Sequence, residues 1–233
     1  MITLAFDTAT PRPSLAVLGH DGVAVEHNLG EVPGGGRRVL EAIHEILEQS
    51  STRVEDLGRI VVGVGPGGFT GIRIGIATAL GLGHAAGVDV VGASSLEALA
   101  LSLRDQRPGA TILAPAIDAR RREVFGAIYR SDGRDLAVLQ EPAAMAPADF
   151  RRAFERAGAP DEVAIGGSGV RAFGDAFSGL GRMDAGPGGH NHPRAVGLIS
   201  RVDAGAGVPA RPVYCRLPDA EENRRRREKE QGR

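Results

Sequence analysis

Short apolar runs separated by turn residues occupy the start of the chain. Residues 2–6, 14–18 and 23–29 are apolar enough to form strands, and His20-Asp21-Gly22 separates the second run from the third. A short turn containing glycine between two such runs is typical of a β-hairpin. The pattern therefore predicts three antiparallel strands before any helix.

Helical periodicity begins after these strands. Residues 37–49 carry apolar side chains at the spacing of one buried helix face, namely Val39, Leu40, Ile43, Ile46 and Leu47. The elements expected next are a strand at 59–64, a glycine-rich loop at 65–71, a helix at 72–86 with Thr70 as its N-cap, a strand at 88–92 and a helix at 94–103.

The same order of elements then begins again. We expect strands at 111–118, 123–129 and 136–140, a helix at 147–156, a strand at 163–165 and a helix at 194–203, with a polar turn at 120–122. The β-β-β-α-β-α order therefore occurs twice. It predicts two α/β halves of similar topology, residues 1–104 and 105–216, followed by a charged tail at 217–233.

Composition excludes several chemistries. Lys229, in the tail, is the only lysine among the 28 basic residues, so the folded body cannot form a Schiff base or complete a P-loop. The single Cys215 cannot form an internal disulfide or a zinc site with several thiolates. The formal net charge of −1 gives no global electrostatic case for nucleic-acid binding. Without a signal peptide or an apolar run long enough to span a membrane, we expect a cytoplasmic protein.

Two turns could hold a phosphate. The first is the turn after strand 2–6, and the second is a loop that ends a strand and opens a helix, where free N–H groups and the helix dipole favour anions. A third glycine-rich turn follows strand 163–165. The candidate nucleotide or phosphate residues are Asp7, Thr8, Gly65, Gly67, Gly68, Thr70, Gly166 and Gly167. The alternative is that these residues only make turn hydrogen bonds and allow close packing.

The helix at 72–86 has an unusual composition. Bulky apolar residues alternate with glycine and alanine, and each interior glycine costs about 1 kcal/mol relative to alanine. Small residues allow another helix to approach closely. One side of this helix should cover the sheet, and the other could bind a partner or be buried within the chain.

No catalytic constellation is evident in the sequence. No two of the six histidines stand four apart on a helix with a nearby carboxylate, as a helical metal site needs, and no G-x-S-x-G elbow is present. The sequence thus predicts neither a metal site nor a catalytic residue.

Four stretches together resemble the TsaB (YeaZ) family. They are the FDTAT stretch at 6–10, VGPGGFTGIRIG at 64–75, the segment at 117–125 and PVYCR at 212–216, so the resemblance covers almost the whole chain. It implies an actin-like, sugar kinase and Hsp70 ATPase fold (ASKHA). It also implies an accessory subunit in the synthesis of N6-threonylcarbamoyladenosine at position 37 of tRNA.

The resemblance also implies partners. These are TsaD, a catalytic paralogue that binds the metal, and the ATPase TsaE, with tRNA reached through the complex. No cofactor is expected in this chain. The two helices of the first half would contact TsaD, and the same surface could form a homodimer. The expected interface residues are Val39, Ile43, Ile46, Leu47, Ile72, Gly75, Ile76, Ala79, Leu80 and Gly83.

Two positions depart from the family pattern. Gly68 stands where serine is usual in the loop, and glycines at 34–36 replace a polar segment before the first helix. The leading hypothesis is a non-catalytic scaffold that activates TsaD. The alternative is a nucleotide-dependent phosphotransferase or peptidase of the same fold. A third hypothesis is direct tRNA binding by Arg120, Arg121 and Arg122 and by the arginines at 224–227.

Overall fold

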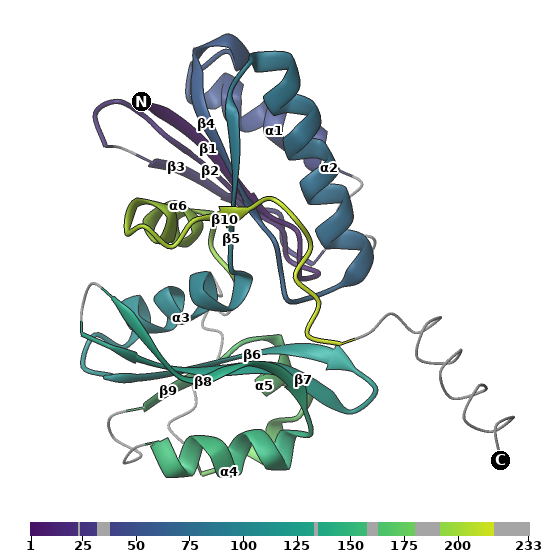
Figure 1. Ribbon diagram of the computed structural model, residues 1–233, viewed down its shortest axis with the longest axis vertical. Helices are drawn as coiled ribbons and strands as arrows, with labels where there is room; N and C mark the ends of the chain where they lie inside the picture. The colour runs from purple at the N-terminus through teal and green to yellow at the C-terminus, as the bar shows by residue number, and fades with distance from the viewer. Residues whose placement is uncertain (23, 32–37, 133–134, 158–162, 180–191, 217–233) are drawn as a thin grey trace, which may run out of the picture.

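Two β-sheets form the centres of two α/β halves. The computed structural model describes residues 1–22, 24–31, 38–132, 135–157, 163–179 and 192–216. The first sheet has the order β10-β5-β4-β1-β2-β3, in which β1 runs antiparallel to β2 and parallel to β4 (Figure 1). Its strands are β1 (Ile2–Asp7), β2 (Ser14–Leu18), β3 (Ala24–Asn28), β4 (Leu57–Gly63), β5 (Asp89–Ala93) and β10 (Val208–Pro209).

The second sheet repeats this arrangement in a shorter form. Its order is β8-β7-β6-β9, and the strands are β6 (Ile112–Arg120), β7 (Glu123–Ser131), β8 (Leu136–Met145) and β9 (Val163–Gly166). Here β6 is antiparallel to β7 and parallel to β9, as β1 is to β2 and β4. The two halves therefore share one topology, as the repeated pattern predicts.

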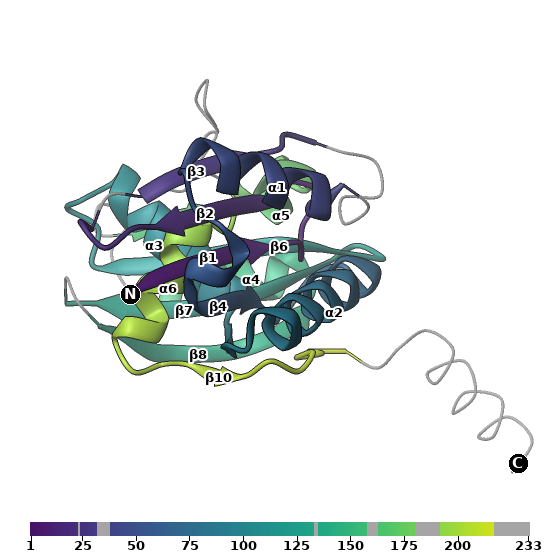
Figure 2. The ribbon, with the colours of Figure 1, turned by 90° about the horizontal axis from the view of Figure 1, so that it is seen from above.

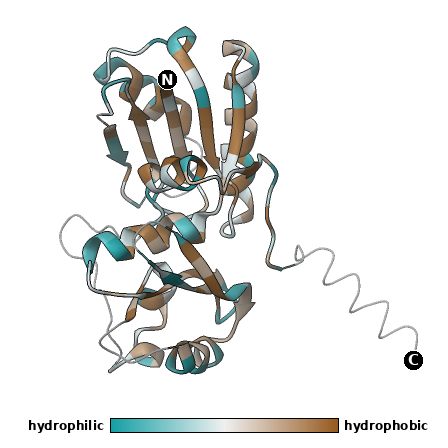
Figure 3. Ribbon diagram, turned by 60° about the vertical axis from the view of Figure 1, so that its left-hand side comes forward, coloured by the Kyte–Doolittle hydropathy of each residue, from teal (hydrophilic) through white to brown (hydrophobic). Residues whose placement is uncertain are grey.

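Helices cover the outer faces of the sheets. In the first half these are α1 (Val39–Gln49) and α2 (Phe69–Ala86), and in the second α4 (Pro147–Ala157), α5 (Ser168–Ala172) and the short 3-10 turn η3 (Gly174–Phe177). A further 3-10 turn, η1 (Val54–Asp56), precedes β4. Figure 3 shows hydrophobic colour along the strands that these helices cover.

Two helices lie between the sheets and pack against each other. They are α3 (Ser95–Gln106) and α6 (Ala195–Asp203), and Figure 1 shows them in this middle layer. In Figure 2, which is seen from above, strands of the first sheet partly hide them. The helix α3 lies almost entirely in the sequence range of the first half but packs on β6 of the second, whereas α6 lies in the range of the second half and packs on β1 of the first. Each half therefore supplies the helix that covers the inner face of the other.

Side-chain size explains how close this middle layer lies to the first sheet. Along β1, Leu4 and Phe6 face α1 and α2, whereas Ala5 faces the middle layer. Several residues on that inner side are small: Ala16 of β2 lies beside Ala5, and Ala93 lies on β5 of the same sheet. Because both faces of β1 are buried, its residues do not alternate between apolar and polar, and the buried Thr3 is the one polar residue before Asp7.

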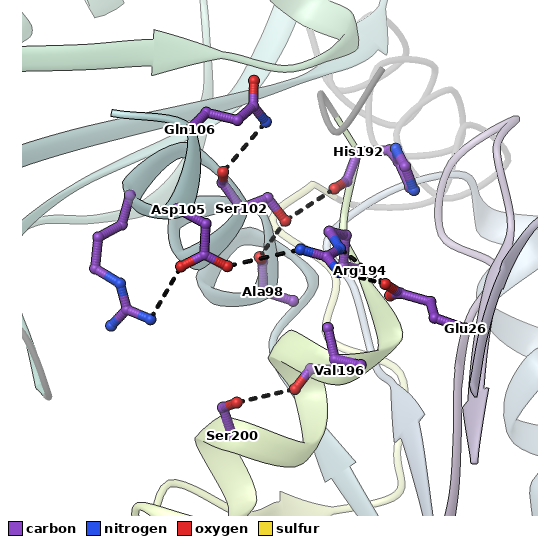
Figure 4. Close-up of polar contacts among 10 residues, drawn as sticks. Glu26, Ala98, Ser102, Asp105, Gln106, His192, Arg194, Val196 and Ser200 are labelled. Atoms are coloured by element: carbon purple, nitrogen blue, oxygen red, sulfur yellow. Dashed lines mark hydrogen bonds and ion pairs between the residues drawn. The ribbon is translucent and has the colours of Figure 1, made fainter. Parts of the chain in front are cut away.

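Ion pairs and a hydrogen bond connect the start of α6 to both halves. Figure 4 shows Arg194 between Glu26 of β3 and Asp105 of α3. The guanidinium lies 2.5 Å from Glu26 and 3.6 Å from Asp105. The hydroxyl of Ser14 donates to the Pro193 carbonyl at 2.7 Å, which adds a second link to the first sheet.

The predicted elements are largely confirmed, with local differences. Thr70 is not the N-cap of α2, because the helix begins at Phe69 and Gly68 caps it without a side-chain hydrogen bond. The sequence pattern missed α5, η1, η3 and β10, which are short, and β8 extends beyond its predicted end. The range 105–216, expected as the second half, includes α6 and β10, which pack on and extend the first sheet.

Several predicted features lie outside the described residues. These are the glycines at 34–36, the loop that contains His190, and the charged tail at 217–233 with its arginines. Among the residues that the structure describes, no helix is long and apolar enough to cross a membrane.

Candidate functional site

The carboxylate of Asp7 is fully buried at the end of β1. Its Oδ1 accepts a hydrogen bond from the Ala9 N–H at 2.8 Å, and its Oδ2 accepts one from the Ser95 hydroxyl at 2.5 Å. Gly63 of β4 leaves room for it, since a Cβ there would lie 2.0 Å from Oδ2. Burial raises the pKa of Asp7 to about 6, although the two hydrogen bonds to the carboxylate lower the pKa by a smaller amount. Both oxygens are therefore bonded within the chain.

The glycine-rich loop lies directly on the turn that follows Asp7. Thr8 donates from Oγ1 to the Gly71 carbonyl at 2.8 Å, and the Gly68 N–H donates to the Ala9 carbonyl at 2.7 Å. A Cβ at Gly67 would lie 2.3 Å from the carbonyl oxygen of Ala9, and one at Gly71 would lie 2.0 Å from that of Thr8. Close backbone packing thus requires glycine at both positions.

The structure brings together only part of the candidate phosphate set. Asp7, Thr8 and the loop from Gly65 to Thr70 meet at the carboxyl end of β1, although Thr70 points to solvent. Gly167 lies in the second half, where its φ of 116° and a Cβ position 2.2 Å from the Ala116 carbonyl oxygen favour glycine. Gly166 is the last residue of β9. A phosphate role for these residues stays a prediction.

Most of the expected interface residues face the interior. Of the ten, Leu80 alone is exposed, and the other nine pack within the chain: Val39, Ile43, Ile46, Leu47, Ile72, Gly75, Ile76, Ala79 and Gly83. The physical reason is that the apolar stripe of each helix covers its own sheet. The structure buries these nine residues within the first half, and their role at an interface stays a prediction.

The outer side of α2 presents small and apolar residues to solvent. We define the α2 outer face as Ala77, Leu80, Gly81 and His84, all of which are exposed. Leu80 keeps 49% of its surface exposed, and Leu40 on α1 keeps 58%. Leu40 was expected in the buried stripe of its helix, and this expectation is wrong because the side chain faces solvent. This outer face, rather than the buried stripe, is available to another protein.

An aromatic cluster at the start of α2 was missed by the sequence reasoning. The rings of Phe69 and Tyr214 stack with their centroids 5.2 Å apart, and the Arg73 guanidinium lies 3.7 Å from the Phe69 centroid. Arg73 Nε also donates to the Tyr214 hydroxyl at 2.9 Å. The PVYCR segment carried part of the family resemblance, and its tyrosine was the signal that could have indicated this cluster.

The described residues hold no group of three or more His, Cys, Asp or Glu side chains that could bind a metal ion. Cys215 is half-buried, and burial raises the pKa of its thiol. A raised pKa lowers the thiolate fraction and hence the reactivity of a cysteine.

Comparison with known proteins identifies the family. The family model for TsaD, tRNA N6-adenosine threonylcarbamoyltransferase, matches residues 36–181. A Mycobacterium tuberculosis protein is 34% identical over 222 residues, which cover 93% of this chain and 92% of its own. The Escherichia coli tRNA threonylcarbamoyladenosine biosynthesis protein TsaB is 39% identical over 132 residues, 57% of this chain and 56% of its own. The chain belongs to the TsaB (YeaZ) family.

A solved structure agrees with this assignment. YeaZ from Pseudomonas aeruginosa superposes with a TM-score of 0.72 at 29% identity, covering 91% of this chain and 100% of that one. The chain therefore has the YeaZ fold, with two α/β halves of one topology. The predicted fold class is confirmed.

Proposed function

We propose that this chain is a non-catalytic subunit in tRNA threonylcarbamoyladenosine biosynthesis, and that it binds and activates TsaD through the outer sides of α1 and α2. Relatives in Escherichia coli and Bacillus subtilis are named for this biosynthesis. The α2 outer face is the observation that carries the proposal, because it displays apolar and small residues at a place where the chain itself gains nothing from them.

Gly81 is the clearest example of a residue on the α2 outer face that the chain's own packing does not require. A Cβ at Gly81 would meet nothing within 4 Å, whereas one at Gly75 would lie 2.3 Å from Thr8 Oγ1 and one at Gly83 would lie 2.4 Å from Val90 Cγ2. Packing inside the chain therefore explains Gly75 and Gly83 but not Gly81. An exposed helical glycine costs about 1 kcal/mol relative to alanine. A partner helix that approaches α2 closely beside Leu80 supplies the reason to keep it.

The remaining parts of the activity are assigned to partners. We propose that TsaD carries the metal and the transfer chemistry, that TsaE supplies ATP hydrolysis, and that tRNA is bound by the complex. In the absence of TsaD, the same apolar face would join two copies of this chain into a homodimer. The alternative of a phosphotransferase or peptidase requires an accessible Asp7, whose two carboxylate oxygens are bonded to Ala9 and Ser95.

The interface test uses Leu80→Arg on the α2 outer face. The full chain is co-purified with TsaD from the same organism, and complex formation is followed by size-exclusion chromatography with light scattering. Leu80→Arg should abolish the complex and lower the threonylcarbamoyladenosine content of tRNA measured by mass spectrometry. Val138→Arg is the matched control, because Val138 on β8 is 44% exposed but lies in the second half. A full-strength complex with Leu80→Arg would contradict the proposal.

A further inference from the structure

An extended segment after β10 crosses from the first half to the second. The strand β10 pairs with β5 at the edge of the first sheet, and the Val213 N–H then donates to the Val64 carbonyl at 2.9 Å. Figure 1 shows this yellow segment passing the start of α2 on its way to the second half, on the side away from α3 and α6. We define the clasp as residues 213–216.

The first-half end of the clasp is anchored on α2 and on the loop before it. The Tyr214 ring stacks on Phe69 with the centroids 5.2 Å apart, and Arg73 Nε donates to the Tyr214 hydroxyl at 2.9 Å. The Val213 carbonyl lies so close to Gly65 that a Cβ there would be 3.0 Å from its oxygen. A backbone hydrogen bond, a ring stack and a side-chain hydrogen bond together hold this end.

Arg216 anchors the other end on the β6–β7 hairpin of the second half. Its guanidinium donates to the Ala119 carbonyl of β6 at 2.9 Å and pairs with Glu123 of β7 at 2.7 Å, so it holds both strands. Hydrogen bonds between charged groups are stronger than those between neutral ones. The neighbouring Cys215 packs against the hydrophobic cluster that contains Ala119 and Phe125.

The position of the clasp limits how the two halves can move. The sheets are joined through the middle layer, where α3 packs against α6. Two units that share such an interface commonly rotate against each other about it. A rotation about the middle layer would change the distance between the start of α2 and the β6–β7 hairpin, and the clasp spans this distance on the far side. The contacts of Arg216 therefore oppose that rotation.

A second ion pair crosses between the halves, but water reaches it. Arg171 of α5 pairs with Glu31, and 59% and 47% of these two side chains are exposed. The corresponding fractions for Arg216 and Glu123 are 20% and 35%. Exposed ion pairs contribute little, because water screens and solvates both charges. Arg171 therefore provides a matched control for Arg216.

We propose that the clasp holds the two halves in the orientation described above, and that its release at Arg216 lets them rotate about the middle layer. Release occurs at this end because a single guanidinium makes both polar contacts there. The other end is continuous with β10 and is held by the backbone of Val213. This inference goes beyond the proposed function and does not depend on it, since every contact of the clasp lies within one chain.

The test measures the distance between the halves in the full chain by pulsed electron paramagnetic resonance. Spin labels are attached through a genetically encoded ketone amino acid at Glu45 of α1 and Arg152 of α4, which are both exposed, so Cys215 stays unmodified. The labelled chain is diluted with unlabelled chain. Arg216→Ala should broaden the distance distribution about twofold, because the halves lose a restraint on their relative motion. Arg171→Ala should leave the distribution unchanged.

A second variant keeps every anchoring side chain and only lengthens the clasp. Insertion of two glycines between Tyr214 and Cys215 adds about 7 Å of extended chain. It should broaden the distribution as much as Arg216→Ala does, because a slack clasp restrains no better than a released one. Circular dichroism and the unfolding temperature check that each variant is folded. If Arg216→Ala does not fold, the insertion variant decides.

Two results would overturn the inference. One is a distance distribution that matches the parent chain in the folded insertion variant. The other is an equal broadening by Arg171→Ala, since loss of any contact between the halves would then have the same effect as loss of the clasp. Both measurements use the chain without TsaD. Failure to form the complex with TsaD would contradict only the proposed function, so the two failures are distinguishable.

Discussion

At the scale of single residues, Asp7 shows how burial changes the role of a carboxylate. Its position in the FDTAT turn suggests a place in a nucleotide or phosphate site, yet the structure places it between Ala9 and Ser95 with no exposed surface. It links the end of β1 to the start of α3, and α3 packs on the other half. Its observed contacts thus connect the two halves of the fold.

The first prediction concerns the pH dependence that Asp7 causes. Burial raises its folded-state pKa from 3.8 to about 6, so the folded chain holds this proton more tightly than the unfolded chain does. Stability from this group is fully present below about pH 4 and is lost as pH rises through 6, by about 3 kcal/mol in total. Thermal unfolding should therefore show a smaller loss of stability between pH 5 and pH 8 in Asp7→Asn than in the parent chain.

The control for this prediction is Asp89→Asn, which neutralises an exposed carboxylate at the start of β5. It should leave the pH profile of the unfolding temperature close to that of the parent chain. If Asp7→Asn shows the same decline from pH 5 to pH 8 as the parent chain, the carboxylate does not titrate in this range.

At the scale of elements, α2 uses its glycines for two different purposes. Gly71 and Gly75 let the helix lie on the turn at Thr8, and Gly83 lets it approach β5. Gly81 faces solvent on the opposite side. The sequence shows one small-residue stripe, but the structure divides it between the chain's own packing and a surface that a partner can reach.

The second prediction compares alanine at Gly75 with alanine at Gly81. Gly75→Ala should destabilise the chain, because its Cβ would lie 2.3 Å from Thr8 Oγ1 and would break the bond from Thr8 to Gly71. Gly81→Ala should stabilise the isolated chain by up to about 1 kcal/mol, since it meets nothing within 4 Å and gains helix propensity. Urea unfolding measures both. Equal effects of the same sign would contradict this division of roles.

The same pair of variants separates stability from binding. If a partner helix approaches closely at Gly81, Gly81→Ala should weaken the complex with TsaD even though the isolated chain is more stable. A complex of unchanged affinity would place the partner away from this part of the α2 outer face.

At the scale of the whole molecule, the packing of α3 against α6 joins the halves. Arg201 of α6 is nearly buried and pairs with Glu97 of α3 at 2.8 Å, with side-chain exposures of 9% and 19%. Tyr129 of β7 lies close by, where burial and then the charge of Glu97 raise the pKa of its hydroxyl. The two helices therefore meet through a charged pair as well as through Ala98, Leu198 and Ile199.

The third prediction tests this ion pair by a double-mutant cycle. Arg201→Met should destabilise the chain by about 2–3 kcal/mol, because it leaves the Glu97 carboxylate poorly solvated. Adding Glu97→Leu should recover part of the loss, since removing both charges also removes the desolvation cost. Chemical denaturation measures each variant. Strict additivity of the two single losses would show that the pair is not coupled.

An exposed pair provides the comparison. Arg38, the N-cap residue of α1, pairs with Glu41 at 3.1 Å, and 66% of each side chain is exposed. Arg38→Met should change stability little, because water screens and solvates both charges. A large effect of Arg38→Met would mean that exposure does not separate the two pairs.

The local pattern of apolar and polar residues determined most of the secondary structure of this protein. The apolar runs and their turns predicted the strands and long helices of both halves, and the repeat predicted their shared topology, because binary patterning follows the period of each element. The FDTAT and GPGGFTG stretches indicated the family that the comparisons later showed. The sequence pattern did not predict short elements such as α5 and β10, because a few residues are too short a stretch to show a periodicity.

Only the tertiary structure decided which side of each element is free. The sequence shows that Leu40 and Leu80 are as apolar as Ile43 and Ile76, but not that the first two face solvent and the others face the sheet. It also does not reveal that α3 and α6 cover each other's halves, or that Arg216 reaches the β6–β7 turn. These contacts join residues far apart in the chain, and their energies depend on distances that only folding sets.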